Sequence, residues 1–114
     1  MSKAQRYFIT ISDLATSRGE LPALSFDGVS PEHLARDLEA ALREPGLWQQ
    51  WRDLQDDPDQ VAPETGVVDP EATVTASLEA HRVEVIISTS LPHAIVKHRL
   101  NLLVGQNWKL RDVS

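Results

Sequence analysis

The stretch that decides the fold is residues 30–44, which read SPEHLARDLEAALRE. Ser30 is a preferred helix N-cap residue, and Pro31 suits the first helical position, where its missing N–H costs nothing. Leucine then recurs every four residues, at Leu34, Leu38 and Leu42. An apolar stripe on an otherwise charged segment is typical of an amphipathic helix, so we predict a helix over 31–44 that packs on an apolar surface.

A shorter helix is predicted directly after this one, because Pro45 and Gly46 end or kink the first. It covers about residues 46–55 and carries its apolar side chains on one side, at Leu47, Trp48, Trp51 and Leu54. Residues 56–70 contain three prolines, a glycine and several aspartates. That composition predicts an internal linker.

The N-terminal part predicts a β-hairpin. Residues 6–12 are rich in β-branched and aromatic side chains and alternate, with Tyr7, Ile9 and Ile11 on one face. After a polar connection, Leu21 to Phe26 is predicted as a second short strand, with Pro22 at its start or on an edge.

The last 42 residues predict a β-meander of four strands. Alternating or β-rich runs occur at 73–78, 83–87, 94–104 and 108–113. The first of these is ambiguous, since residues 76–81 would also form a helical turn. The last two are expected to pair through a three-residue turn, Gly105 to Asn107, with Val104 opposite Trp108 and Leu102 opposite Leu110.

Together these elements predict one α+β domain spanning residues 1–114. Its architecture is a mainly antiparallel sheet of five to six strands, with the main helix packed on one face. The side chains expected in the core are Leu34, Leu38, Leu42, Ile9, Ile11, Val85, Ile87, Leu100, Leu102 and Trp108.

Composition excludes several classes of protein. The 114 residues include no cysteine, which removes disulfide scaffolds, zinc–thiolate sites and thiol nucleophiles. The N-terminal apolar run is too short for a signal peptide and no stretch is long enough to span a bilayer, so we expect a cytoplasmic protein that does not act on membranes.

The net charge of −6 is a sum of unlike parts. Residues 1–72 hold six basic and 14 acidic residues, a charge of −8, whereas residues 73–114 hold five and three, a charge of +2. The acidic part argues against a nucleic-acid partner. The positive charge of the C-terminal part is compatible with an acidic partner.

A basic stripe is predicted on the outer face of the last hairpin. If 94–104 and 108–113 are paired strands, one face carries Lys97, Arg99, Asn101, Lys109 and Arg111. Such a stripe could hold an anionic partner; alternatively it is an ordinary solvated face, or it pairs with acidic residues of the same chain. No aromatic residue lies among the cations to stack a base, which makes nucleic acid a less favoured partner.

An apolar patch is predicted on the same side of the sheet, facing away from the helix. It consists of Phe8, Ile86, Ile95 and Leu103. Contiguous exposed apolar patches tend to be interfaces, most simply between two copies of a chain. The alternatives are scattered surface hydrophobes or a patch covered by the short helix.

No catalytic, metal or cofactor site is predicted. His33, His81, His93 and His98 show no metal-ligand spacing, and the aspartates at 53–59 lack the glycine and glutamate of a calcium loop. No serine motif or glycine-rich phosphate loop is present. Trp48 and Trp51 could stack a ligand, although a Leu/Trp stripe at helical spacing is more often part of a core.

The run from Phe26 to Leu42, a strand end followed by Asp-Gly-Val-Ser-Pro-Glu and a leucine-rich helix, resembles antitoxins of the HicB type. Their remaining motifs are missing, so no residue role is carried over. Small size and acidity are also similar to those of type III secretion chaperones, without the C-terminal helix that such proteins would imply.

These observations lead to the hypothesis of a non-enzymatic interaction protein: an adaptor, inhibitor, chaperone or immunity-type module that binds a protein partner or forms a homodimer. Two alternatives stay open. One is a small-ligand-binding protein or small enzyme with a pocket between helix and sheet that uses His98 or the tryptophan pair. The other is a nucleic-acid-associated regulator that uses the basic stripe.

Overall fold

The computed structural model describes residues 4–28 and 30–114. Within them, four strands and three α-helices follow in the order β1 (Gln5–Ile11), α1 (Pro31–Arg43), α2 (Gly46–Asp53), β2 (Thr73–Glu79), β3 (Arg82–Thr89), α3 (His93–Val104) and β4 (Trp108–Val113). Short 3₁₀ turns lie at Leu14–Thr16, Pro58–Gln60 and Pro63–Gly66.

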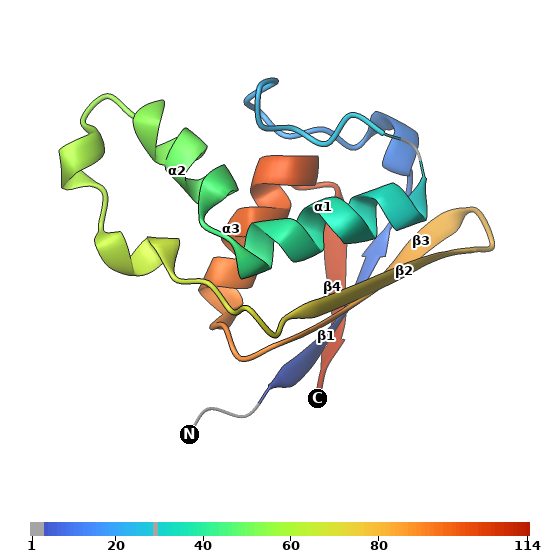
Figure 1. The fold of residues 1–114 in the computed structure, drawn as a ribbon. Coiled ribbons are helices and arrows are strands. Elements are labelled where there is room, and N and C mark those ends of the chain that lie inside the picture. Colours follow the sequence, from blue (N-terminus) through green and yellow to red (C-terminus); the bar gives the residue numbers. More distant parts are fainter. Residues whose placement is uncertain (1–3, 29) are drawn as a thin grey trace.

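The four strands form one antiparallel sheet in the order β2-β3-β1-β4. Figure 1 shows the helices on one side of this sheet, with α1 and α3 above the strands. Because β3 lies between β1 and β2, and β1 lies between β3 and β4, each β-α-β unit is split by one strand. This β-α-β-β-α-β connectivity is the ferredoxin-like arrangement. The predicted α+β class and antiparallel sheet are confirmed, whereas the predicted number of five to six strands is wrong.

Helix α1 begins and packs as its sequence indicates. The Ser30 hydroxyl accepts a hydrogen bond from the backbone N–H of His33 at 3.1 Å, and Pro31 occupies the first turn. Leu34, Leu38 and Leu42 are completely buried. The stripe that predicted the helix is therefore the surface by which the helix joins the core.

The inner face of the sheet follows the predicted alternation. Tyr7, Ile9 and Ile11 of β1 are buried under the helices, and their cross-strand partners include Ile87 and Val85 of β3. All ten side chains predicted for the core are buried except Trp108, which is partly buried against it. Leu102 is buried as well, although it lies outside the main cluster.

The second strand of the predicted N-terminal hairpin does not form. Residues 21–25 make a turn instead, in which the N–H groups of Leu24 and Ser25 donate to the carbonyl of Leu21. Phe26 N–H then donates to the Leu103 carbonyl at the end of α3, and the Phe26 ring is buried. Leu24 and Phe26, the two buried residues of this stretch, therefore anchor it to the rest of the molecule, and Pro22 cannot donate to a strand ladder.

Residues 94–104 form helix α3, so the predicted strand and its hairpin are wrong. Ile95, Val96, Leu100, Leu103 and Val104 are all buried, which is a spacing that a helix surrounded by core satisfies. Strands β3 and β4 run parallel to each other on either side of β1, and such a pair requires a crossover connection rather than a tight turn. Gly105, with φ of 68°, ends the helix. The predicted pairs Val104–Trp108 and Leu102–Leu110 do not exist, since β4 pairs with β1.

The ambiguity at residues 76–81 is settled in favour of a strand. β2 continues to Glu79 and meets β3 through a two-residue turn, Ala80 and His81, with φ values of 47° and 76°. Both residues occupy the left-handed region, as a type I′ hairpin turn requires, although neither is the Asn or Gly that adopts it easily.

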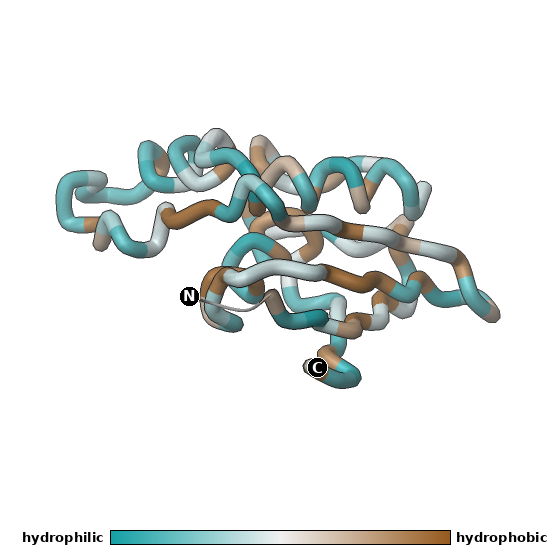
Figure 2. Tube along the Cα trace, turned by 60° about the horizontal axis from the view of Figure 1, so that its bottom comes forward, coloured by the Kyte–Doolittle hydropathy of each residue, from teal (hydrophilic) through white to brown (hydrophobic). Residues whose placement is uncertain are grey.

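The linker (residues 56–70) is pinned to the rest of the molecule at several points. Figure 2 shows mostly hydrophilic colour along it, interrupted by a hydrophobic stretch shortly before β2. Asp69 closes its end: its N–H donates to the Leu42 carbonyl, and its carboxylate accepts from the Thr89 hydroxyl at 2.8 Å and the Ser90 N–H at 3.0 Å. Burial alone would raise the pKa of Asp69, but these hydrogen bonds and one from Glu71 N–H outweigh it and hold the pKa below its usual value.

Candidate functional site

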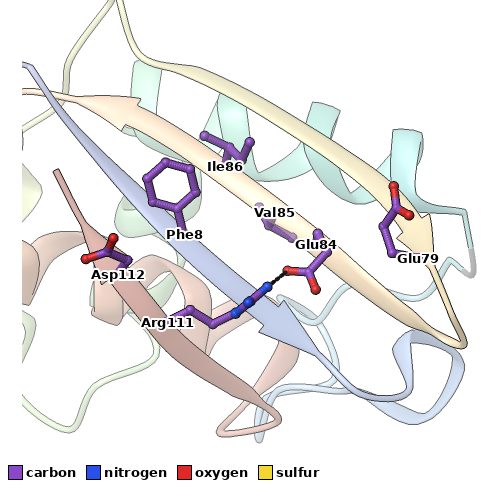
Figure 3. A pocket seen from close by; sticks show the side chains of 7 residues that line it. All are labelled: Phe8, Glu79, Glu84, Val85, Ile86, Arg111 and Asp112. Atoms are coloured by element: carbon purple, nitrogen blue, oxygen red, sulfur yellow. Dashed lines mark hydrogen bonds and ion pairs between the residues drawn. The ribbon is translucent and has the colours of Figure 1, made fainter.

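The sheet face turned away from the helices is open. Phe8 of β1 and Ile86 of β3 stand directly opposite each other on it, and Ile86 is 39% exposed. Figure 3 shows the two side chains next to each other on this face, with Arg111 reaching from β4 toward Glu84 on β3. We call this surface the open face. Its apolar part is the pair Phe8 and Ile86, and charged side chains lie beside that pair.

Glu84 organises the charges of the open face. One carboxylate oxygen accepts from Arg111 and from the Thr10 hydroxyl, both at 3.0 Å, while the other lies 3.2 Å from Nε of Arg82. Burial alone would raise the pKa of Glu84, but the hydrogen bonds from Arg111 and Thr10 and the charges of both arginines bring it below its usual value. Glu84 is therefore firmly ionised at neutral pH.

A β-bulge brings β4 into this arrangement. The register between β1 and β4 shifts between Phe8 and Ile9, so that Phe8 pairs with Asp112 and Ile9 with Leu110. Arg111 is the extra residue, and the bulge turns Arg111 toward the same face as Asp112. The result is a hollow of about 650 Å³ on the open face, lined by Phe8, Glu79, Glu84, Val85, Ile86, Arg111 and Asp112.

The predicted basic stripe is divided by the structure, because 94–104 is a helix and not a strand. Lys109 and Arg111 lie exposed on β4. Lys97 is exposed on α3, and Asn101 one turn later accepts a hydrogen bond from the Trp108 indole at 2.9 Å. These four residues surround β4, but they do not share one face of a two-stranded ribbon.

Arg99, the fifth member of the stripe, is completely buried. Its guanidinium donates to the carbonyl oxygens of Thr65 at 2.7 Å and Val67 at 3.4 Å, and to Nδ1 of His98 at 2.6 Å. Within residues 4–28 and 30–114 no carboxylate pairs with it, and burial lowers the pKa of Arg99 to about 10. Arg99 therefore holds the linker and is not accessible to a partner.

The predicted apolar patch is divided in the same way. Phe8 and Ile86 lie together on the open face. Ile95 and Leu103 are buried in the core cluster, because residues 94–104 form helix α3 and not a strand with an outward face. Two residues of the predicted apolar patch, Phe8 and Ile86, thus share the open face with two residues of the predicted basic stripe, Lys109 and Arg111.

A second concave region lies between α2, α3 and the loops before α1 and β4. It has a volume of about 500 Å³, and Trp51 and His98 form part of its wall together with Arg18, Glu20, Leu21, Asn101, Leu102, Gly105, Gln106 and Asn107. The rings of Trp51 and His98 meet edge to face at 4.5 Å. Burial, and to a lesser degree the charge of Arg99, lowers the pKa of His98 below its usual value.

The remaining histidines lie apart from one another. His33 pairs with Asp37 one turn along α1 at 3.3 Å, and His93 stacks on Tyr7. Across the described part of the chain, no group of three or more acidic or histidine side chains could hold a metal ion. None of the helices described there has the length and apolar character needed to cross a membrane.

Two features of the open face were missed in the sequence. Glu84 interrupts an otherwise apolar strand on the same face as Ile86, and this interruption was the available signal. The bulge that turns Arg111 outward gives no sequence signal of its own. No protein-family model, curated protein or solved structure matches this chain.

Proposed function

We propose that this chain is a non-enzymatic interaction protein (an adaptor, inhibitor, chaperone or immunity-type module) whose open face binds a protein partner. The observation that carries the proposal is the pair formed by half-buried Phe8 and exposed Ile86 beside the Glu84–Arg111 ion pair. Aromatic side chains and arginine are enriched at protein interfaces, and an apolar centre with a polar rim is their usual anatomy.

The chemistry of the hollow favours binding over catalysis. Glu84 forms part of its wall, and two arginines and a threonine hold that carboxylate in its ionised form. A general acid or base works best when its pKa lies near the operating pH. The pKa of Glu84 is instead lowered, which moves it further from neutral pH. The same ion pairs instead give the face a fixed pattern of charge that a partner can match.

The open face favours a protein over a nucleic acid. RNA-binding sheets of comparable size stack bases on two or three aromatic side chains. Of the two aromatic residues of β1, Tyr7 is buried under the helices and only Phe8 belongs to the open face.

The test is to compare a substitution on the open face with one elsewhere. Ile86→Glu places a charge in the apolar centre, whereas Leu54→Glu places the same charge at the end of α2, where Leu54 is 55% exposed. We expect affinity purification from the cells that make the protein to lose a specific partner with Ile86→Glu only. Equal recovery with both variants would contradict the proposal. Light scattering on the purified chain tells whether that partner is a second copy.

The region between α2 and α3 supports a second candidate function, the binding of a small molecule. The specific observation is a concave region of about 500 Å³ whose wall contains an aromatic side chain and His98, whose Nε2 is buried without a hydrogen-bond partner among the described residues. Ligand sites commonly have this size and composition. Screening a fragment collection by NMR should shift resonances of Trp51 and His98; the absence of any such hit would remove this candidate.

A further inference from the structure

The outer edge of β4 carries unpaired backbone groups. The N–H and C=O groups of Arg6 and Ser114 bond to each other, and pairs alternate between bonded and non-bonded along an antiparallel ladder. Counting along the register from that pair, the N–H and C=O groups of Trp108 and Leu110 and the C=O group of Val113 point away from β1, whereas the Val113 N–H donates to the Asp112 carboxylate at 2.9 Å. The edge therefore presents a row of donors and acceptors to any chain that lies beside it.

Apolar side chains accompany these backbone groups. Leu110 pairs with Ile9 and Val113 with Tyr7, so both lie on the helix side of the sheet, yet they are 37% and 38% exposed. Beside them, a groove of about 310 Å³ runs between α3 and β4, lined by Lys97, Asn101, Gln106 and Trp108. An added strand would place alternate side chains over these residues and complete the cover of the inner face.

The charges around this edge are mostly positive. Lys97 and Lys109 form no ion pair within the described residues, Arg111 of β4 already pairs with Glu84, and Asp112 is the only acidic residue of β4. A second copy that paired β4 with β4 would bring these cations together, and lysine on an edge strand opposes such self-pairing. An acidic strand would neutralise them.

From this complementarity we infer that the edge of β4 accepts an extended segment of a partner protein whose side chains alternate between apolar and acidic. The apolar side chains would cover Leu110 and Val113, and the acidic ones would lie beside Lys109 and Arg111 on the open face. Strand addition of this kind obtains affinity from main-chain hydrogen bonds and specificity from alternate side chains. The inference rests on the proposed function and names the partner's local structure.

The size of the open face supports an extension toward this edge. Four strands about 4.8 Å apart, each with about seven residues rising about 3.3 Å, span roughly 19 Å by 23 Å, or about 450 Å². A stable interface covers about 800 Å² on each partner. A partner that binds the open face and also pairs with the β4 edge would enlarge this contact, and the edge offers outward backbone groups there.

The test uses a fluorescein-labelled peptide of about seven residues that alternates valine and glutamate, with a valine–lysine peptide as its control. Fluorescence anisotropy should show saturable binding of the glutamate peptide, weaker at high salt, and at least about tenfold weaker binding of the lysine peptide. Leu110→Pro removes an outward N–H and should weaken binding at least about tenfold, whereas Leu110→Val should keep it within about threefold.

A second variant covers the case in which Leu110→Pro does not fold. Lys109→Glu changes only an exposed side chain of the open face and should reverse the preference to the lysine peptide. The inference is overturned by equal binding of both peptides, by no binding at about 1 mM, or by unchanged binding to the folded proline variant. It is also overturned by a dimer that Leu110→Pro dissociates, which would make a second copy the occupant.

The proposed function and this inference can fail separately. If Ile86→Glu loses its partner while the peptide does not bind, the result supports the open face as a binding surface and contradicts strand addition at the β4 edge. If the peptide binds at the edge while Ile86→Glu retains every partner, the result supports strand addition and contradicts the open face as a binding surface.

Discussion

Two arginines that the sequence placed on one surface have opposite surroundings in the structure. Arg99 is enclosed between α3 and the linker and gives its N–H groups to the Thr65 and Val67 carbonyls. Arg111 stands on the open face, its side chain 57% exposed, and pairs with Glu84 of a neighbouring strand. An arginine bonded to backbone carbonyls fixes a segment of chain in place, whereas one paired across a sheet surface leaves that surface accessible.

The regions around the two arginines differ in the same sense. Near Arg99, the Trp48 indole donates to the Thr65 hydroxyl at 2.9 Å, and Gly66 packs against the indole face. Near Arg111, Phe8 and Ile86 are cross-strand neighbours, and Ile86 is 39% exposed. We therefore expect substitutions near Arg99 to change stability and substitutions on the open face to change binding.

The largest difference is expected between Arg99→Ala and Arg111→Ala. Arg99→Ala leaves the Thr65 and Val67 carbonyls without their donor inside the protein and should lower the free energy of unfolding by about 3 kcal/mol. Arg111→Ala removes an exposed ion pair and should cost less than about 1 kcal/mol. Urea unfolding followed by circular dichroism measures both, and equal losses would contradict the comparison.

Glycine at position 66 should be the next most sensitive position. A Cβ atom there would lie 2.8 Å from the Trp48 ring, so Gly66→Ala should cost about 2 kcal/mol. Gly46→Ala is the matched control, because a Cβ at the start of α2 meets nothing within 4 Å and alanine favours the helix. Thermal unfolding should show a lower midpoint for the first variant and an unchanged or higher one for the second. The reverse order would show that the linker is loosely held.

Acidification should weaken the Arg99 region through His98. Nδ1 of His98 accepts from Arg99 and so must be unprotonated, and the lowered pKa means that the folded chain binds this proton less readily than the unfolded chain. The stability that His98 contributes is therefore complete above the ordinary histidine pKa of about 6.5 and is lost as the pH falls from there toward the folded-state value.

His98→Asn keeps an acceptor near the Nδ1 position and does not titrate. Between pH 7 and pH 5 it should show a shallower fall in unfolding free energy than the unmodified chain, which loses at most about 1.4 kcal/mol per pH unit through this residue. Identical pH profiles would mean that His98 does not sense protons in the folded chain.

The smallest effect on stability is expected at Ile86. Ile86→Thr keeps a β-branched side chain on a half-exposed strand position and should change the unfolding free energy by less than about 0.5 kcal/mol. A loss above about 2 kcal/mol, measured in the same urea experiment, would show that Ile86 supports the fold and would weaken its assignment to a binding surface.

Local patterns were sufficient to predict much of this fold. Ser30, Pro31 and the leucine stripe predicted α1, and alternation predicted the strands at 6–12, 73–78 and 83–87, with the correct buried faces for the first and the last. These elements have one apolar face each, so their period appears directly in the sequence.

Helix α3 could not be predicted in this way because it is buried on most sides. A segment with apolar residues on nearly every face has no clear period, and Lys97, Arg99 and Asn101 happened to alternate with apolar neighbours as in a strand. Because residues 94–104 were interpreted as a strand, Arg99 was predicted on its outer face and residues 108–113 were predicted to pair with that strand. The exposed halves of both predicted surfaces, Phe8 and Ile86 with Lys109 and Arg111, survived because β1, β3 and β4 themselves were predicted correctly.

The most direct test of the open face as a binding surface is site-specific photo-crosslinking. A photoreactive amino acid is placed at position 86 on the open face or at position 54 beside the linker, in otherwise identical chains expressed in the cells that make the protein. We predict a discrete crosslinked partner from position 86, lost when Arg111→Glu is added, and none from position 54. The same partner from position 54, or no crosslink at position 86, would contradict the account.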